Sequence, residues 1–232
     1  MSGFVGIVCG LKSEAVAVRA SMKAAGIDES KVRIGVSGAN ADRAEEIAQG
    51  FLSDGARAII SAGLCGGLDP ALKSGDVVLG ERVVSAQGDI VIADKRLTAA
   101  ADKFSPRHVA IFGSDEIVDS VEKKKALFQR YAAETVDMES HGAARAAAKA
   151  EIPFIAIRVV ADGHDRALPK AALRAVTPSG GVNVMNVLVD CLKSPQQFEE
   201  IALLGRDSGA ATEGLRRDFG GFLGAFFLAL DL

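Results

Sequence analysis

Apolar, β-branched runs alternate along the chain with alanine-rich runs whose apolar residues recur at helical spacing. Short runs rich in Val and Ile are typical of buried strands. The strands predicted in this way are Gly3–Val8, Lys31–Val36, Ala58–Ser61, Asp76–Val84, Val109–Phe112, Thr135–Met138 and Phe154–Val160. The helices predicted between and after them are Lys12–Ala25, Ala39–Asp54, Val121–Tyr131, Ser140–Ala150 and Gly181–Leu192. This alternation predicts an α/β fold of three layers, with a twisted, mostly parallel or mixed central sheet flanked by helices.

No internal repeat or low-complexity linker interrupts the pattern, which predicts a single domain over residues 1–232. Residues 194–232 follow the alternating part as a helical, apolar C-terminal extension. It contains an amphipathic segment at Phe198–Ser208 and a strongly apolar one at Phe222–Leu232. The apolar segment is too short to span a bilayer, which needs about twenty residues. We expect it to pack on the core, on another subunit or on a lipid surface.

Two acidic residues lie where predicted elements begin and end. Glu139 stands at the start of the helix Ser140–Ala150, and Asp162 follows the strand Phe154–Val160. In an open α/β sheet, ligands bind outside the carboxyl ends of the strands. Both carboxylates are therefore candidate site residues. The structural alternative is a contact with the helix dipole for Glu139 and a turn for Asp162.

Two further segments place glycines or an acid directly after a strand. The first strand runs into Gly10 and then Glu14, in the first turn of the next helix, where an acid also complements the helix dipole. Strand Ala58–Ser61 is predicted to run into a glycine-rich turn. Glycines allow a backbone to approach a ligand closely and to turn its amides inward.

Taken together, these segments resemble the purine nucleoside phosphorylase and nucleosidase superfamily. The matching motifs are Gly10-Leu11-Lys12-Ser13-Glu14-Ala15, Gly63-Leu64-Cys65-Gly66-Gly67-Leu68, Lys73-Ser74-Gly75-Asp76-Val77-Val78, Val136-Asp137-Met138-Glu139-Ser140 and Ile157-Arg158-Val159-Val160-Ala161-Asp162. The resemblance covers about residues 4–192 and implies a nucleoside phosphorylase-like fold and an enzyme that cleaves N-glycosidic bonds. It also implies that Glu139 holds the ribose hydroxyls, Asp162 protonates the leaving purine and Glu14 activates an attacking water.

The chemistry of this reaction calls for such groups. Breaking an N-glycosidic bond builds positive charge on the sugar and negative charge on the base, so an acid near the base and a carboxylate near the ribose both lower the barrier. Ile117 stands where methylthioadenosine-type nucleosidases present an aromatic residue, so the base is expected to lie between aliphatic side chains. The other residues expected to contact the nucleoside are Met138, Val118, Gly63, Leu64, Cys65 and Gly66. His141 is a candidate for fixing the Glu139 carboxylate.

The attacking group stays open between water and phosphate as a co-substrate. Leu64 stands where many relatives carry a hydroxyl residue, which contacts phosphate in the phosphorylases. A strand-to-helix turn is nevertheless a place where backbone amides can meet an anion. The candidate phosphate-binding residues are Gly10, Ser37, Gly38 and Arg43. A plain turn capped by Ser37 or Asn40 is the alternative for this segment.

Composition limits the classes of partner. A formal net charge of -3 and a pI near 5.7 provide no basic surface for a nucleic acid. The cysteines Cys9, Cys65 and Cys191 have no zinc-site spacing, and neither a metal nor another cofactor is expected. Without a leader-like segment, a cytoplasmic protein is expected. The family resemblance implies a homo-oligomer.

The opening motif, the Gly63–Leu68 motif and the sequence Leu-Gly-Arg-Asp-Ser at 204–208 are similar to the hopanoid-associated phosphorylase branch. That branch is implied to remove adenine from adenosylhopane, a lipid-linked nucleoside, and the apolar tail would then favour peripheral contact with the inner membrane. One alternative is a general purine nucleoside phosphorylase or a methylthioadenosine/S-adenosylhomocysteine-type nucleosidase. Another is a non-catalytic nucleoside-binding protein, against which the retention of Glu14, Glu139 and Asp162 speaks.

Overall fold

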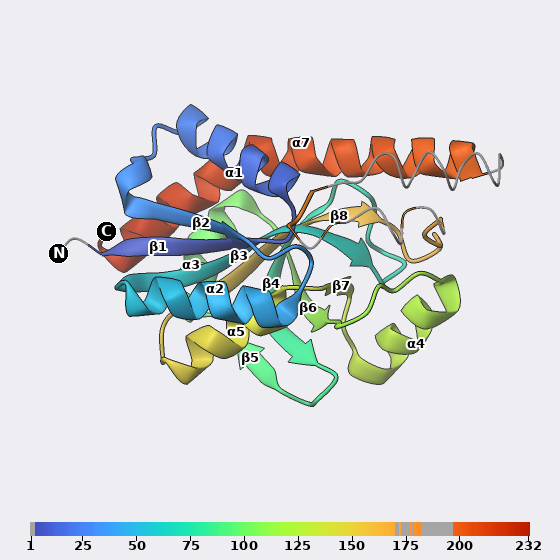
Figure 1. Cartoon of the computed structure of the whole chain (residues 1–232), viewed down its shortest axis with the longest axis horizontal. Coiled ribbons are helices and arrows are strands. Elements are labelled where there is room, and N and C mark those ends of the chain that lie inside the picture. Colours follow the sequence, from blue (N-terminus) through green and yellow to red (C-terminus); the bar gives the residue numbers. More distant parts are fainter. Residues whose placement is uncertain (1–2, 170–171, 173–176, 178, 182–196) are drawn as a thin grey trace.

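The computed structural model describes residues 3–169, 172, 177, 179–181 and 197–232, and Figure 1 shows their arrangement. The strands are β1 (Phe4–Cys9), β2 (Val32–Val36), β3 (Ala56–Gly67), β4 (Val77–Ser85), β5 (Ile90–Ile92), β6 (Arg107–Gly113), β7 (Thr135–Asp137) and β8 (Phe154–Asp162). The α-helices are α1 (Lys12–Ala24), α2 (Ala41–Ser53), α3 (Lys95–Ala101), α4 (Val121–Tyr131), α5 (Ser140–Lys149) and α7 (Gln197–Leu230). Short 3₁₀ segments lie at Glu29–Lys31 and Asp102–Phe104.

The strands form one mixed sheet in the order β2-β1-β3-β7-β6-β4-β5, and β8 pairs with both β3 and β4. Because β8 joins β3 to β4 while β7 and β6 join them from the other side, these five strands close into a ring. The pairs β1/β2, β1/β3, β3/β8, β4/β6 and β6/β7 are parallel, whereas β3/β7, β4/β5 and β4/β8 are antiparallel. The prediction of a mostly parallel or mixed sheet is confirmed.

Helices cover both faces of the sheet, as predicted. In Figure 1, α1 and α7 lie above the strands and α2 and α5 below them. One core cluster joins residues of α1, α3 and α7 to one face of the sheet, and a second joins α2 and α5 to the other. The three-layer arrangement brings the carboxyl ends of β1, β3 and β8 to the same end of the sheet.

The predicted boundaries differ from the observed ones where turn chemistry or a short element decides them. Strand β5 and helix α3 were not predicted, because a strand of three residues carries little periodic signal and α3 depends on the Asp94 cap, which accepts hydrogen bonds from the amides of Arg96 and Leu97. Helix α2 begins after Asn40, since Ala39 has a left-handed backbone with φ 55°. The predicted helix Gly181–Leu192 lies outside the described residues.

The C-terminal extension forms one helix rather than two segments. Helix α7 spans 34 residues, and its second half packs against α1, α3 and the sheet. The apolar side chains of this half that lie buried in the core are Phe219, Phe222, Leu223, Phe226, Phe227 and Leu230. Only Leu228 among the large apolar residues of this half is exposed. The apolar tail is thus a core element, which removes these buried side chains from contact with a membrane or another subunit.

No helix in the described part of the chain combines the length and the apolar content needed to cross a membrane.

Candidate active site

The carboxyl ends of β1, β3, β7 and β8 and the starts of α1 and α5 border one cavity of about 950 Å³. Every residue predicted to form the site lines this cavity except Gly10 and Gly63. The residues that line it are Glu14, Ser37, Gly38, Arg43, Leu64, Cys65, Gly66, Ile117, Val118, Met138, Glu139 and Asp162. Four of the five motifs therefore meet at one place, and the motif Lys73–Val78 does not line the cavity.

Glu14 lies in the first turn of α1, where it is buried. Its Oε2 accepts a hydrogen bond of 2.8 Å from the amide of Leu11, and its Oε1 accepts one of 2.8 Å from the amide of Leu64. Burial raises the pKa of the Glu14 carboxyl, although Arg158 and these amides act in the opposite direction. Glu14 thus satisfies an amide at the start of the helix, and it also reaches across to β3.

Glu139 directly precedes α5, and its buried side chain lies beside Gly10. A Cβ on Gly10 would lie 2.2 Å from Oε1 of Glu139 and 3.3 Å from Oε2 of Glu14, so the two carboxylates face each other there. Burial and the neighbouring Asp137 carboxylate raise the pKa of Glu139 to about 8, with Arg158 opposing them. The Glu139 carboxyl therefore takes up a proton more readily than an exposed one.

Gly63 and Gly66 were predicted to lie in a turn, and the structure places them elsewhere. Strand β3 continues through Gly67, so Gly63 and Gly66 lie within a strand rather than in a turn. A Cβ on Gly63 would lie 2.8 Å from the Glu14 carboxyl atoms. Gly10 and Gly63 therefore make room for the protein's own carboxylates, and the prediction that Gly63 and Gly66 lie in a turn was wrong.

Arg158 is a site residue that the sequence did not reveal. It is fully buried on β8, its Nε donates to Oδ2 of Asp137 at 2.6 Å, and its guanidinium donates to the hydroxyl of Ser61 at 2.6 Å. The same guanidinium lies 3.7 Å from Oε2 of Glu139. Burial lowers the pKa of Arg158, but the surrounding carboxylates outweigh that effect and raise it. A permanent positive charge therefore lies beneath the carboxylates of the cavity.

Asp162 ends β8 and is buried. Its Oδ2 accepts a hydrogen bond from the ammonium group of Lys124 on α4, a second residue that sequence reasoning missed. Burial raises the pKa of the Asp162 carboxyl, and the attraction of Lys124 offsets only part of this effect. The result is a carboxyl that holds its proton more readily than an exposed one.

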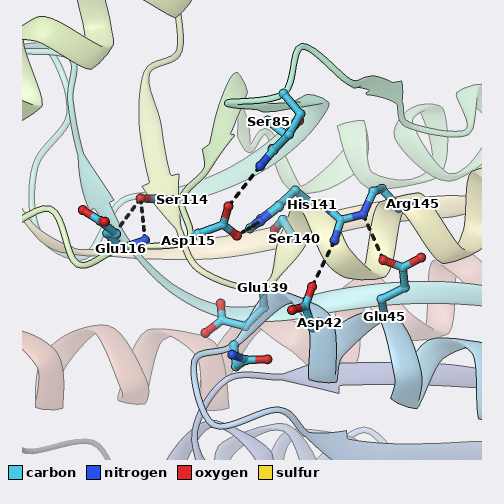
Figure 2. A network of polar contacts seen from close by, with 12 residues as sticks. Asp42, Glu45, Ser85, Ser114, Asp115, Glu116, Glu139, Ser140, His141 and Arg145 are labelled. Atoms are coloured by element: carbon cyan, nitrogen blue, oxygen red, sulfur yellow. Dashed lines mark hydrogen bonds and ion pairs between the residues drawn. The ribbon is translucent and has the colours of Figure 1, made fainter.

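His141 does not fix the Glu139 carboxylate, so that expectation was wrong. Figure 2 shows the two side chains pointing to different sides, with the His141 ring directed at Asp115. The Nε2 atom of His141 lies 2.9 Å from Oδ1 of Asp115. Residues two positions apart at the start of a helix do not face each other. The imidazole of His141 therefore does not reach the Glu139 carboxylate, although the two residues are close in sequence.

The residues proposed to bind phosphate have most of their donors occupied. The Ser37 hydroxyl donates to the carbonyl of Cys9 at 3.3 Å, and the amide of Gly38 donates to the carbonyl of Gly10 at 2.9 Å. Only the side chain of Arg43 adds positive charge to the cavity wall at this turn. The turn is therefore held by internal hydrogen bonds, as the structural alternative predicted.

Part of the remaining wall is apolar, and the Cys65 thiol in it is not reactive. Leu64, Ile117, Val118 and Met138 contribute aliphatic surface to the cavity. Burial raises the pKa of the Cys65 thiol well above its usual range, which keeps it protonated and unreactive. Among the described residues, no group of His, Cys, Asp and Glu is arranged to hold a metal ion.

A family model described as "Phosphorylase superfamily" matches residues 21–193. The chain belongs to the phosphorylase superfamily. The prediction of an enzyme of the nucleoside phosphorylase and nucleosidase class is thereby confirmed at the level of the family. No curated protein matches the sequence with significant similarity.

Several solved structures share the fold of this superfamily member. Futalosine hydrolase of Helicobacter pylori superposes with a TM-score of 0.67 at 15% identity, with 96% of this chain and 97% of that chain covered. The 5′-methylthioadenosine/S-adenosylhomocysteine nucleosidase of Neisseria meningitidis, in complex with methylthio-immucillin-A, gives 0.65 at 18% identity, covering 94% and 99%. The H. pylori enzyme of the same name gives 0.67 at 16%, covering 93% and 97%. At such identities the likeness shows the fold alone, and it does not distinguish the hopanoid-associated branch from other branches.

Proposed function

We propose that this enzyme cleaves the N-glycosidic bond of an adenosine-type nucleoside, with water as the attacking group. One observation carries the proposal. Glu14, Glu139 and Asp162, which come from segments far apart in the sequence, are all buried and border one cavity. Burying carboxylates is costly, and a group of them in a cavity is a functional arrangement rather than a stabilising one.

Each acid has a role that its surroundings support. Asp162, whose pKa is raised by burial, donates a proton to the leaving base. Glu139 binds the ribose hydroxyls and balances the charge that develops on the sugar. Glu14, whose pKa is also raised, accepts the proton of the attacking water.

Water is favoured over phosphate by the charges at this end of the cavity. An incoming phosphate would face the carboxylates of Glu14 and Glu139, whose oxygens meet at Gly10. The amide of Gly38 and the hydroxyl of Ser37 are already bonded to carbonyl oxygens. The family's water-activating acid is present, while the hydroxyl that contacts phosphate is replaced by Leu64.

The size and lining of the cavity favour a bulky apolar substituent on the nucleoside. A volume of about 950 Å³ is at the upper end of the roughly 300–1,000 Å³ typical of small-molecule pockets. Leu168, Ile201 and Leu204 add apolar surface from the β8–α7 side. We therefore extend the proposal to a lipid-linked adenosine such as adenosylhopane.

The test is release of adenine from adenosine, from methylthioadenosine and from an adenosine with a bulky apolar 5′-substituent, each with and without phosphate. We expect release without phosphate and preference for the apolar substituent. Release that depends on phosphate would make the enzyme a phosphorylase. Equal rates on all three would favour a general nucleosidase, and no release from any would leave a nucleoside-binding protein.

The acid role of Asp162 has its own test in Asp162→Asn. General acid catalysis is typically worth roughly a hundred- to ten-thousand-fold, so we expect the rate of adenine release to fall by that order. Because Asn leaves the buried ammonium of Lys124 without its charged partner, Tm should also fall, and the rates are compared at a temperature at which circular dichroism shows the variant to be folded. A variant that releases adenine at the wild-type rate would contradict the role.

A further inference from the structure

Lys124 is a buried lysine on α4. Its side chain is 1% exposed, whereas its neighbour Lys123 is 56% exposed and pairs with Asp119. The Nζ atom of Lys124 donates to Oδ2 of Asp162 and, at 2.6 Å, to the carbonyl oxygen of Gly163. Lys124 also lines the cavity. A lysine is rarely buried in this way unless its charge is used.

The ion pair between Lys124 and Asp162 bears on the role of Asp162 as the general acid. A carboxylate next to an ammonium group tends to stay ionised, yet an acid must carry a proton to give one away. The other charged or titratable groups that face Asp162 are Arg166 in the following loop, Asp207 on α7 and Cys65 on β3. Arg166 and Asp207 pair with each other and largely cancel. Lys124 is therefore the charged group that bears most directly on the proton of Asp162.

We propose that Lys124 is the proton reservoir of Asp162 and acts through it as a positioning residue in N-glycosidic cleavage, an inference that rests on the proposed function. As the bond between sugar and base breaks, its electron pair moves onto the base. The O–H bond of Asp162 breaks and an N–H bond forms on the base, while an N–H bond of Lys124 breaks and its proton moves to Asp162. After the base leaves, Glu14 releases the proton of the attacking water to solvent, and the neutral amine of Lys124 takes up a proton from solvent, so that no net proton is gained or lost.

The geometry supports this direction of transfer. Asp162 has one oxygen on the Lys124 ammonium, and it lines the cavity, so the carboxyl can bond the lysine and the base at the same time. The bond from Lys124 to the Gly163 carbonyl holds the ammonium in place when the carboxyl is protonated. A guanidinium in the same position would keep the charge but would not release a proton, because an arginine side chain stays protonated in proteins.

The experiment compares Lys124→Arg, Lys124→Met and the matched control Lys123→Met with the wild type. Each is assayed on the best adenosine-type substrate and on 4-nitrophenyl riboside, whose leaving group departs without a proton. We expect Lys124→Arg to lower kcat for adenine release about tenfold or more, with little change in KM. Its rate on 4-nitrophenyl riboside should change less than about threefold, and Lys123→Met should behave as the wild type.

The pH profile separates a reservoir from a structural role. In Lys124→Met, Asp162 has no lysine to restore its proton, so a reservoir predicts that the loss of kcat at high pH begins at lower pH than in the wild type. If Lys124 acted only through its charge, which lowers the pKa of Asp162, its removal would move this loss to higher pH. The inference is overturned if Lys124→Arg releases adenine at the wild-type rate, if both substrates slow together, or if the loss of kcat in Lys124→Met begins at the wild-type pH or at a higher one. If the proposed function itself is wrong, the wild-type enzyme will release no adenine. That result would overturn both the proposed function and the role of Lys124.

Discussion

Replacing Arg158 with methionine tests whether its buried charge holds the carboxylates of the site together. The guanidinium is fully buried and bonds Asp137 at 2.6 Å and Ser61 at 2.6 Å, with Glu139 at 3.7 Å. Methionine is unbranched, like the aliphatic part of arginine, and its flexible side chain fits an apolar interior. The substitution therefore removes the charge and keeps part of the space filled, so its main effect should be electrostatic.

The expected loss of stability follows from the free-energy cost of leaving a buried charge without its partner. Removing one member of a buried ion pair costs about 3–5 kcal/mol, because the remaining carboxylates are left uncompensated. For a domain of this size, each kcal/mol lowers Tm by about 2–4 °C, so Tm should fall by roughly 10 °C. An exposed ion pair would contribute only about 0.2–1 kcal/mol.

The loss of stability in Arg158→Met should also depend on pH. With Arg158 in place, the pKa of Glu139 is already about 8. Without the guanidinium, the pKa values of the nearby carboxyls in the folded protein rise further, so the folded protein holds its protons to higher pH than the unfolded chain. A group with a raised folded-state pKa contributes stability that is lost as pH rises. Arg158→Met should therefore lose more stability relative to the wild type at pH 8.5 than at pH 5.

The assay is thermal unfolding of the wild type, Arg158→Met and the control Arg145→Met across that pH range. Arg145 pairs with Glu45 on the outer side of α5 and α2 and is partly exposed, so its loss should be small and nearly independent of pH. The reasoning is refuted if Arg158→Met at pH 8.5 is as stable as Arg145→Met, or if its loss is the same at both pH values.

Two further changes test the local geometry. Gly10→Ala places a Cβ 2.2 Å from Oε1 of Glu139, so we expect adenine release to fall at least tenfold while Tm changes little, and steady-state kinetics at the wild-type level would contradict the close approach. His108 lies between the Glu81 and Asp102 carboxylates; partial burial lowers its pKa, but these hydrogen bonds outweigh burial and raise it. Its contribution is therefore fully present below about pH 6.5 and lost as pH rises through the raised pKa. The Tm difference between the wild type and His108→Gln should be larger at pH 6 than at pH 9, and a constant difference would speak against the pairing.

Most of the fold could be predicted because its strands are continuous apolar runs. A strand buried on both faces reads as such a run, and the alternation of strands and helices leaves few other arrangements. The helix Val121–Tyr131 was predicted with its observed bounds, since Ser120 caps it and its apolar residues recur at helical spacing. The glycine-rich segment was predicted as a turn because glycine favours turns locally, whereas β3 extends through it by pairing with β8 and β7.

The candidate site was predictable to the extent that its residues lie at the ends of elements. Glu14, Glu139 and Asp162 could be proposed because helix starts and strand ends are the places where ligands meet an α/β sheet. The contribution of Lys124 and Arg158 to the site could not be predicted in this way. Lys124 belongs to a run of three lysines that reads as a solvated helix face, and Arg158 is a single charge within a strand.

The sequence by itself determined most of the strands and helices and placed acids at their ends, because both properties depend on neighbouring residues. The tertiary structure alone decided which charges are buried and with which partners. Lys124 and Asp162 are 38 positions apart, and Arg158 and Asp137 are 21 apart. Such pairs form only when strand pairing and helix packing bring the segments together, and the energy of a charge depends on the burial that this packing creates.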